Sequence, residues 1–374
     1  MSSPVLHTLV VDSSLVFRKI IGDLLLDISG IKLVGQAPTG KIAIQKAQSL
    51  KPDLIILDMN LQDMSGLEVL RQLRELRVGS RVIVVSAASP NMTLLTMKAL
   101  SAGAFEFVLK PEAETIEETR SLLEPEFKLA VQALIESLRI HRSMNIAGSS
   151  SSSGATAKAA AGNLPAETGA GRLPKSFSGR SIELIVIGVS TGGPPALIEV
   201  FSAVREPLRV PVIIVQHIPR FFSEALATSI RERSGLWVEE AKDGMLLEPG
   251  HVYLAPGGEH LKLARGGSAG SHVLRLTHDK PENNCRPSVD YLLRSVAENF
   301  SGRIGLFIMT GMGTDGLAGA RLIRAAGGYI ATQDAGSCVV YGMPRAVLEA
   351  GLADEVLALG AIAPTMQKLA RRIV

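Results

Sequence analysis

The sequence predicts an α/β protein that consists of two doubly wound parallel-sheet domains joined by a flexible linker. Three observations support this fold class: strand-length apolar runs alternate with helical patterns, a low-complexity segment interrupts them, and the same alternation then resumes. The chain has 374 residues, more than a single hydrophobic core usually accommodates. We expect domains at 1–125 and 181–374, with a helical extension and a Ser/Gly/Ala-rich linker over 126–180.

The first predicted domain contains short apolar runs of strand character. They are HTLVV, IKLVG, DLIIL, RVIVV and FEFVL, at residues 7–11, 31–35, 53–57, 81–85 and 105–109. The segments between them include 13–28 and 65–76, which show helical periodicity. Strands that alternate with helices in this way form a parallel sheet that helices cover on both faces.

The predicted linker covers residues 143–180 and contains mostly Ser, Gly and Ala, with very few large apolar side chains. Such a segment cannot bury enough apolar surface to offset the entropy of ordering it. The alternative is a long loop inside one domain, which we disfavour because structureless insertions of this length are uncommon in compact folds.

The second predicted domain resumes the alternation. Its strands are ELIVIGV, PVIIVQH, HVYLAP and RIGLFIMTG, at residues 183–189, 211–217, 251–256 and 303–311. We expect the segment from HVYLAP through VLRLTH, residues 251–278, to form a hairpin-like excursion from this sheet.

Composition limits the partners and the location of the protein. Its 39 Lys and Arg residues nearly balance its 36 Asp and Glu residues, which gives no reason to expect nucleic acid or an acidic membrane as the main partner. Cys285 and Cys338 do not form a CxxC pair, and the N-terminus has no export-type apolar block. We therefore expect a cytoplasmic monomer that neither inserts into a membrane nor binds nucleic acid.

Polar side chains stand at the carboxyl ends of four strands in the first predicted sheet. They are Asp12, Asp58, Ser86 and Lys110. Any one of the acids could be a helix cap, but in open parallel sheets functional groups collect at this edge, so the four should meet in one pocket. Carboxylates suit a hard divalent cation, and a lysine suits a phosphoryl oxygen. The sequence therefore predicts an aspartyl-phosphate switch.

These residues and their spacing make residues 5–125 resemble the receiver domain of two-component response regulators, which has a flavodoxin-like fold. The resemblance implies a phosphoacceptor, ligands for Mg²⁺ and residues that respond to the phosphoryl group. The implied phosphoacceptor is Asp58, and the implied Mg²⁺ ligands are Asp12, Asp58 and the carbonyl of Asn60. The residues that would respond to the phosphoryl group are the switch hydroxyl Ser86, the switch aromatic Phe107 and the phosphate-sensing Lys110.

Two positions depart from the receiver pattern. Receivers carry two adjacent acids after the first strand, but here Ser13 takes the place of the second acid, and Gln62 stands near the place of a usual proline. The loss of one acid gives two alternatives, ordinary Mg²⁺ affinity or weakened affinity. We predict that acetyl phosphate with Mg²⁺ phosphorylates Asp58.

The segment ELIVIGVSTGG, residues 183–193, places Ser190 at the end of a buried strand, just before a helix that Pro194 and Pro195 open. The free N–H groups of a helix N-terminus can stabilise a developing oxyanion. Ser190 is therefore a candidate nucleophile, although the segment alone could also be a phosphate-binding glycine turn.

A serine nucleophile needs a base and a carboxylate that orients the base. Of the seven histidines, His217 ends a predicted strand at the same sheet edge as Ser190. Asp315 follows the strand RIGLFIMTG, where it could alternatively cap the next helix. GVSTG satisfies the bare GxSxG pattern, but the chain order Ser, His, Asp differs from that of α/β-hydrolases, so this pattern discriminates weakly.

Further motifs decide between these readings. GVSTGG, QHIP, TGMGTDG, CRPSVD and YGMPRAV make residues 181–372 resemble the catalytic domain of the chemotaxis protein-glutamate methylesterases, a Rossmann-like domain. The resemblance implies hydrolysis of glutamate γ-methyl esters on methyl-accepting chemoreceptors, often with deamidation of receptor glutamines, under the control of a chemotaxis histidine kinase. In the esterase step no metal is required.

The resemblance also implies roles for individual residues. Ser190 would be the nucleophile, His217 the general base and then acid, and Asp315 the orienting carboxylate. The backbone N–H groups near Thr191 and Met312 are oxyanion-hole candidates, or these residues serve only in loop packing. In CRPSVD, the two charged candidates for substrate contact, or for a structural ion pair, are Arg286 and Asp290.

We expect phosphorylation to activate the esterase by releasing a block of its active site by the receiver domain. Two other functions are considered. One is a non-catalytic phosphate-accepting or scaffolding regulator, which Ser13 makes conceivable. The other is an esterase of a parallel chemosensory pathway, with the same active site and different receptors.

Overall fold

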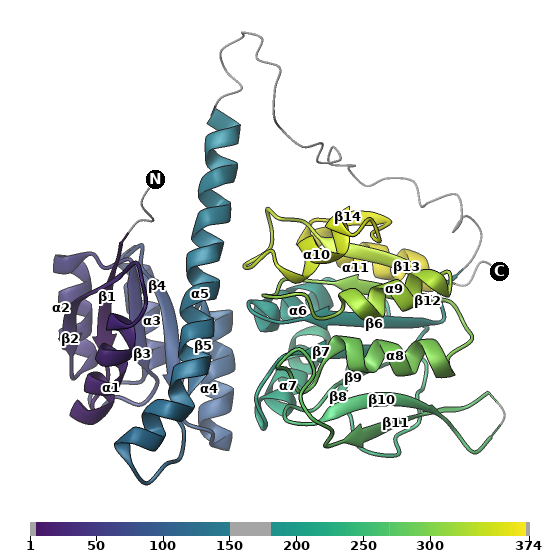
Figure 1. Cartoon of the computed structure of the whole chain (residues 1–374), viewed down its shortest axis with the longest axis horizontal. Coiled ribbons are helices and arrows are strands. Elements are labelled where there is room, and N and C mark those ends of the chain that lie inside the picture. The colour runs from purple at the N-terminus through teal and green to yellow at the C-terminus, as the bar shows by residue number, and fades with distance from the viewer. Residues whose placement is uncertain (1–4, 150–180, 269, 372–374) are drawn as a thin grey trace. The chain divides into compact units, whose positions relative to one another are not determined.

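The computed structural model describes residues 5–149, 181–268 and 270–371 (Figure 1). The chain divides into two compact units between Leu134 and Ile135, and each unit is described here by itself. In the described residues, no helix is both long enough and apolar enough to span a membrane.

The first unit contains a five-stranded parallel sheet with the strand order β2-β1-β3-β4-β5. Its strands are β1 (Leu6–Val11), β2 (Ile31–Ala37), β3 (Leu54–Asp58), β4 (Arg81–Ser86) and β5 (Glu106–Leu109). Its helices are α1 (Leu15–Leu26), α2 (Gly40–Leu50), α3 (Gly66–Glu75), α4 (Pro90–Ser101) and the first part of α5 (Ile116–Ser149), which continues past the division between the units. The five predicted strands and the predicted α/β class are confirmed for this unit.

Side-chain caps fix where several helices of this unit begin. Ser14 Oγ accepts a hydrogen bond from Phe17 N–H at the start of α1, and Ser65 Oγ accepts one from Glu68 N–H at the start of α3. A hydroxyl at this position satisfies an N–H group that the helix itself leaves unpaired. Each helix can therefore start directly after the loop that leaves a strand, which keeps the loops short at the carboxyl edge of the sheet.

Helix α5 crosses the predicted domain boundary at residue 125 and carries Pro125 inside it. It reaches Ser149, so the backbone of residues 143–149 is helical where we predicted the start of a linker. A Ser/Gly/Ala-rich composition is no barrier here, because the helix has already been nucleated by the preceding residues. The rest of the predicted linker, 150–180, lies outside the described residues, and the domain boundaries stay predictions.

The second unit contains a seven-stranded parallel sheet with the order β14-β13-β12-β6-β7-β9-β8. These strands are β6 (Leu184–Val189), β7 (Val212–Gln216), β8 (Trp237–Glu240), β9 (His251–Leu254), β12 (Ile304–Ile308), β13 (Tyr329–Gln333) and β14 (Glu355–Leu357). The helices are α6 (Gly193–Ser202), α7 (Phe222–Ser234), α8 (Val289–Asn299), α9 (Leu317–Ala325), α10 (Met343–Glu349) and α11 (Leu359–Ala370). The second parallel-sheet domain is thus confirmed.

One prediction about this sheet was wrong. Strand β9, which we assigned to a hairpin-like excursion, lies inside the main sheet between β7 and β8. Only β10 (His260–Arg265) and β11 (His272–Thr277) form an antiparallel hairpin. The apolar residues of β9 are buried, and this burial is what places the strand in the sheet.

One hydrophobic core of the second unit lies between the sheet and a layer made by α8, α9 and the hairpin. Val186 of β6, Leu292 of α8, Ile323 of α9 and Leu263 of the hairpin belong to one buried cluster. The hairpin thus helps to hold α8 against the sheet, and α8 in turn begins at the functional site described below.

In each sheet the chain starts near the middle and later crosses to the other side. In the first unit this reversal lies between β1 and β3, and in the second it lies between β6 and β12. Loops leave a parallel sheet in opposite directions at such a switch point, which opens a crevice at the carboxyl ends of the strands. Both candidate sites lie there.

Candidate active site and phosphoacceptor site

The site of the first unit is built around two buried carboxylates and one lysine. Lys110, just after β5, places its Nζ 2.7 Å from Oδ2 of Asp12 and 2.8 Å from Oδ2 of Asp58. The Phe17 ring lies 4.6 Å from the same nitrogen, measured to the ring centroid. One ammonium group therefore bridges the ends of β1 and β3 and offsets the repulsion between their carboxylates.

The second oxygen of each carboxylate accepts a backbone hydrogen bond from its own loop. Ser14 N–H donates to Asp12 Oδ1 at 2.8 Å, and Asn60 N–H donates to Asp58 Oδ1 at 3.1 Å. Burial raises the pKa of Asp58, and so does the charge of Asp12, against the opposing effect of Lys110. Asp58 is thus less acidic than an ordinary aspartate.

The side chains of the other predicted residues of this site form no hydrogen bond or ion pair with Asp12 or Asp58 that is seen among the described residues. Ser86, at the end of β4, is fully buried and accepts a hydrogen bond from Thr96 Oγ1 of α4 at 2.8 Å. Phe107 lies in β5 and is half-buried, and the Asn60 side chain is exposed. The structure therefore brings together Asp12, Asp58 and Lys110, while the Ser86 hydroxyl is engaged elsewhere.

The donor set of this pocket fits a hard divalent cation, because two carboxylates converge in it and already share one cation, the Lys110 ammonium. Ser13 adds no third carboxylate, and its backbone carbonyl accepts a hydrogen bond from Arg18 at 3.1 Å. The pocket therefore offers a divalent cation fewer charged ligands than the receiver pattern does.

The site of the second unit follows three adjacent strands. Ser190 comes directly after β6, His217 after β7 and Asp315 in the loop after β12. Because β6 pairs with β7 in the register Val189 to Gln216, the next residues, Ser190 and His217, follow paired positions. The chain thus gathers a hydroxyl, an imidazole and a carboxylate at one edge of the sheet from segments far apart in the sequence.

The imidazole of His217 is fixed from both of its nitrogens. Nε2 lies 2.7 Å from Asp315 Oδ2, and Nδ1 lies 3.4 Å from Cys285 Sγ. The hydroxyl of Ser190 makes no hydrogen bond to any residue within the described ranges. Since Asp315 occupies Nε2, a proton from a substrate-site hydroxyl would have to be accepted by Nδ1, the nitrogen that Cys285 Sγ contacts.

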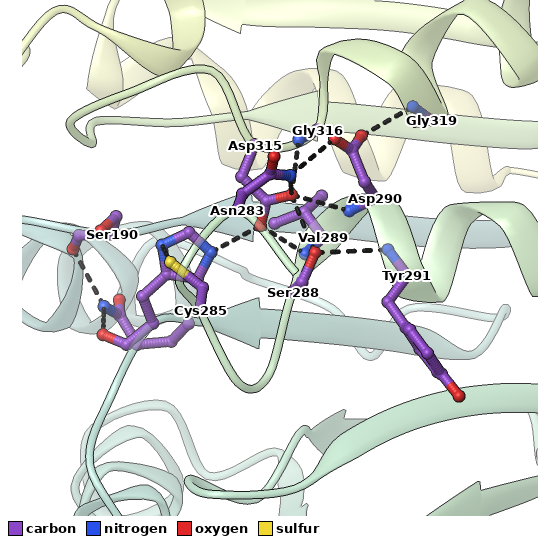
Figure 2. Close-up of polar contacts among 12 residues, drawn as sticks. Ser190, Asn283, Cys285, Ser288, Val289, Asp290, Tyr291, Asp315, Gly316 and Gly319 are labelled. Atoms are coloured by element: carbon purple, nitrogen blue, oxygen red, sulfur yellow. Dashed lines mark hydrogen bonds and ion pairs between the residues drawn. The ribbon is translucent and has the colours of Figure 1, made fainter. Parts of the chain in front are cut away.

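The Asp315 carboxylate is surrounded by donors besides His217, as Figure 2 shows. They are Ser288 Oγ, Val289 N, Asp290 N, Gly316 N and Asn283 Nδ2, at 2.7–3.1 Å. Three of these come from the first residues of α8 and its cap, so Asp315 binds the N-terminus of a helix that is not its own. The alternative that Asp315 merely caps α9 is not what the structure shows, since Gly316 is the cap residue there.

These contacts move the pKa values of the pair in opposite directions. Burial by itself lowers the pKa of His217, but its contacts with Asp315 and Cys285 outweigh burial and raise that pKa to about 9. Burial by itself raises the pKa of Asp315, but His217 and the N–H groups of Asp290 and Val289 hold it well below its ordinary value. The His217 imidazole is therefore more basic, and the Asp315 carboxylate more acidic, than the same groups exposed to solvent.

The backbone N–H groups of Thr191 and Met312 are the two oxyanion-hole candidates. Within the described residues neither N–H donates a hydrogen bond. Gly311, next to Met312, packs so closely that a Cβ on it would lie 2.7 Å from the Cβ of Ser190. The close approach of this glycine brings the Met312 backbone to the serine. This geometry agrees with an oxyanion hole near Ser190, and Thr191 and Met312 both stay candidates for it.

Arg286 and Asp290 do not form the ion pair that we considered. Arg286 donates to the carbonyls of His278 and Asp279, whereas Asp290 is buried and accepts hydrogen bonds from Gly319 N–H and Asn283. Substrate contact by Arg286 stays a prediction.

Sequence reasoning did not find four residues that contact the catalytic candidates. They are Gln216, whose amide donates to the carbonyls of Ser190 and His217, together with Asn283, Cys285 and Ser288. The one available signal was the Asn283–Asn284 pair beside CRPSVD, because asparagine tolerates the left-handed backbone of tight turns.

Comparison with known families agrees with this division into two sites. The family described as response regulator receiver domain matches residues 8–119, and the family described as CheB methylesterase matches residues 185–366. A protein-glutamate methylesterase/protein-glutamine glutaminase of Desulfotalea psychrophila is 39% identical over 96% of this chain and 96% of its own length. The chain belongs to the CheB methylesterase family. It combines a receiver domain with a methylesterase domain.

Further members of the CheB methylesterase family are similarly related. A Myxococcus xanthus protein-glutamate methylesterase/protein-glutamine glutaminase is 38% identical over 94% of both chains. The crystal structure of the Thermotoga maritima CheB methylesterase catalytic domain is 39% identical, covers 50% of this chain and 99% of its own, and has a TM-score of 0.48. The response regulator domain of Thermotoga maritima CheB is 32% identical over 33% of this chain and 95% of its own, with a TM-score of 0.29.

Proposed function

We propose that this protein hydrolyses glutamate γ-methyl esters on methyl-accepting chemoreceptors and deamidates receptor glutamines, with Ser190, His217 and Asp315 as its catalytic residues. The observation that supports this most is the hydrogen bond of His217 Nε2 to Asp315 Oδ2 at 2.7 Å, at the strand end paired with that of Ser190. A serine hydroxyl beside an oriented imidazole is the arrangement that acyl transfer requires.

In the first step Ser190 Oγ attacks the ester carbonyl while His217 Nδ1 accepts the hydroxyl proton. The Nε2–H of His217 stays hydrogen-bonded to Asp315, whose negative charge stabilises the imidazolium. The imidazolium then gives its proton to the leaving methoxide, so that methanol departs and an acyl-enzyme forms. With a glutamine substrate the leaving group is ammonia.

In the second step water attacks the acyl-enzyme. His217 Nδ1 accepts a proton from this water and returns it to Ser190 Oγ as the glutamate carboxylate leaves. In both steps the negative charge that develops on the carbonyl oxygen would be stabilised by the N–H groups of Thr191 and Met312, which have no acceptor among the described residues. All atoms are supplied by the ester, one water and the two side chains.

The receiver site would control this chemistry. Asp58 would accept a phosphoryl group from a chemotaxis histidine kinase, Lys110 would contact the phosphoryl oxygens, and the Ser86 hydroxyl and Phe107 would respond to them. Mg²⁺, held by Asp12, Asp58 and the carbonyl of Asn60, would neutralise charge on the phosphoryl oxygens. The cytoplasmic location and the monomeric state stay predictions.

The decisive experiment measures methanol release from methylated chemoreceptors by the wild type, by Ser190→Ala and by Ser301→Ala. Ser301 is an exposed serine and serves as a matched control. We expect Ser190→Ala to lose methanol release and Ser301→Ala to retain it. Equal rates for all three proteins would remove Ser190 from the mechanism.

Regulation has its own test in the full chain. Acetyl phosphate with Mg²⁺ should phosphorylate Asp58 and raise the rate of methanol release, and Asp58→Asn should abolish both effects. A rate increase that persists in Asp58→Asn, or phosphorylation without any change of rate, would contradict the proposed control.

A further inference from the structure

A four-residue turn, Glu282–Cys285, lies directly against the His217–Asp315 pair. Its ends exchange two backbone hydrogen bonds, Glu282 N–H to Cys285 O at 3.1 Å and Cys285 N–H to Glu282 O at 2.9 Å. The two central residues, Asn283 and Asn284, have φ values of 54° and 59°. Two left-handed residues in succession characterise a type I′ turn, and asparagine adopts this conformation more readily than most residues.

The amide of Asn283 binds two carboxylates at once. Its Nδ2 donates to Asp315 Oδ1 at 2.8 Å and to Asp290 Oδ2 at 3.0 Å, as Figure 2 shows. An amide nitrogen carries two hydrogens, so each carboxylate receives one of them. Although Asn283 itself is exposed, both of its acceptors are buried, with exposed fractions of 5% for Asp290 and 3% for Asp315.

The two carboxylates depend on this amide to different extents. Asp315 Oδ1 also accepts from Ser288 Oγ and from two backbone N–H groups. Asp290 Oδ1 accepts from Gly319 N–H at 2.7 Å, but for Asp290 Oδ2 the Asn283 amide is the single hydrogen-bond donor among the described residues. Without Asn283, therefore, Asp290 Oδ2 would be left beside Asp315 with no donor.

Two buried carboxylates without a shared donor tend to hold a proton between them. A proton bound to Asp290 could then be donated to Asp315 Oδ1. Such a proton would withdraw negative charge from the oxygen pair that holds His217 Nε2 and stabilises the imidazolium.

We propose that Asn283 is a positioning residue of the esterase reaction: one amide binds both carboxylates, keeps Asp315 ionised and fixes its Oδ2 on His217 Nε2. This leaves Nδ1 as the nitrogen that exchanges protons with Ser190. The proposal rests on the proposed function, since it assumes that His217 and Asp315 are catalytic. Asn283 itself touches neither the ester nor the reacting atoms.

The predicted pH signature belongs to the Asp290–Asp315 pair. Burial raises the pKa of Asp290 to about 6, and the charge of Asp315 acts in the same direction, while the hydrogen bonds from Gly319 and Asn283 oppose them. The other titratable or charged groups around this pair are His217, which binds Asp315, Cys285, which contacts His217, and Arg294, which pairs with Glu282. None of them replaces the amide as a donor to Asp290 Oδ2 within the described residues.

The test compares Asn283→Gly with Asn284→Gly in the full chain. Glycine adopts the positive φ of both positions without strain, so each variant keeps the turn, but only the first loses the amide between the carboxylates. For Asn284 no side-chain hydrogen bond is seen within the described ranges. The pair of variants therefore separates the amide from the backbone of the turn.

We expect Asn283→Gly to lower kcat for methanol release about 10-fold with KM changed less than about 2-fold, because it disturbs orientation and not substrate binding. In the wild type, log(kcat/KM) should fall more steeply below about pH 6, where the carboxylate pair takes up a proton. In Asn283→Gly this break should move upward by about 1 pH unit, since a hydrogen bond to the ionised form is lost. Asn284→Gly should match the wild type in both respects.

A second measurement does not depend on turnover. The proton on His217 Nε2 should give a low-field NMR resonance through its hydrogen bond to Asp315, and Asn283→Gly should shift or broaden that resonance at pH 7 while Asn284→Gly preserves it. Equal kinetics for the two glycine variants, or a loss of kcat with an unmoved pH break and an unchanged resonance, would overturn the proposal. Retention of activity by Ser190→Ala would instead overturn the proposed function, so the two failures are distinguishable.

Discussion

Both sites of this protein are built from aspartates at the switch point of a parallel sheet, but they treat their carboxylates differently. In the receiver unit, a single charged group, Lys110, bridges the Oδ2 atoms of Asp12 and Asp58. In the esterase unit, Asp315 is surrounded by neutral donors from α8 and neighbouring loops, and among the described residues His217 is its one hydrogen-bond donor that can carry a charge.

The difference follows from what each carboxylate has to do. Asp58 is proposed to form a bond to phosphorus, and burial, together with the charge of Asp12, raises its pKa. Asp315 is proposed only to orient and stabilise His217, and its many donors lower its pKa and fix its orientation. The same side chain is thus made reactive or inert by the number and charge of its neighbours.

The largest effect on the esterase reaction is expected from removal of the His217 imidazole. His217→Ala should lower kcat for methanol release by about 10⁴-fold, because the nucleophile then lacks its base. His278→Ala is the matched control, since that side chain is 77% exposed. Phosphorylation of Asp58 by acetyl phosphate should be unchanged in both variants. A residual rate near that of the wild type would show that another group acts as the base.

Truncation of Lys110, whose ammonium group bridges Asp12 and Asp58, should mainly affect the stability of the receiver unit. Lys110→Ala leaves two buried carboxylates facing each other, so we expect the free energy of unfolding of the receiver unit to fall by about 3 kcal/mol at pH 7. Added Mg²⁺ should restore part of this loss in denaturant titrations. Lys98→Ala, at an exposed position of α4, should change little. A loss that is equal in the two variants would contradict the bridging role.

The pH dependence should separate the two sites. Because the pKa of His217 is raised to about 9, its neutral form, the base, is scarce at neutral pH, and kcat/KM for the ester should rise about 50-fold between pH 7 and 9. The stabilisation from the His217–Asp315 pair is complete below the ordinary histidine pKa and is lost as pH rises through about 9.

For Asp58 the raised pKa acts on the acid side. Labelling by acetyl phosphate requires the ionised carboxylate, so it should decline at a higher pH than for an ordinary aspartate. Methanol release that is independent of pH between 7 and 9 would argue against the raised pKa of His217.

A smaller effect is expected at Ser13, where the receiver pattern has an acid. Ser13→Asp should tighten Mg²⁺ binding about 10-fold, because a third carboxylate then faces the cation site. Ser13→Asn has nearly the same size without the charge and should leave the affinity close to that of the wild type. Isothermal titration with Mg²⁺ distinguishes the two, and equal affinities would mean that position 13 does not face the metal.

The parts of the fold that the sequence predicts correctly are those with strong local patterns. In the first unit β3 and β4 are runs of buried, mostly apolar residues, and so are β6, β7 and β12 in the second. Strands β8 and β14 have only four and three residues, and β13 (YIATQ) mixes apolar and polar side chains that tertiary packing buries. Their pairing depends on neighbouring strands and not on their own sequence.

The candidate site shows the same division. The ends of buried strands pointed to Ser190, His217 and Asp315, because topology brings such ends together. The contacts of Asn283 could not be predicted, since they depend on the left-handed φ of a turn in a loop distant from Asp315 in sequence. Which imidazole nitrogen faces the carboxylate is likewise a result of side-chain rotamers and not of residue spacing.

The central position of β6 has a consequence for biosynthesis. Its two neighbours, β7 and β12, lie on opposite sides of it, and the His217–Asp315 hydrogen bond joins residues that are 98 positions apart. A nascent chain that ends before β12 therefore carries the serine and the histidine without the carboxylate. Since pairings between distant segments form late in folding, esterase activity should emerge only when the whole sheet has assembled.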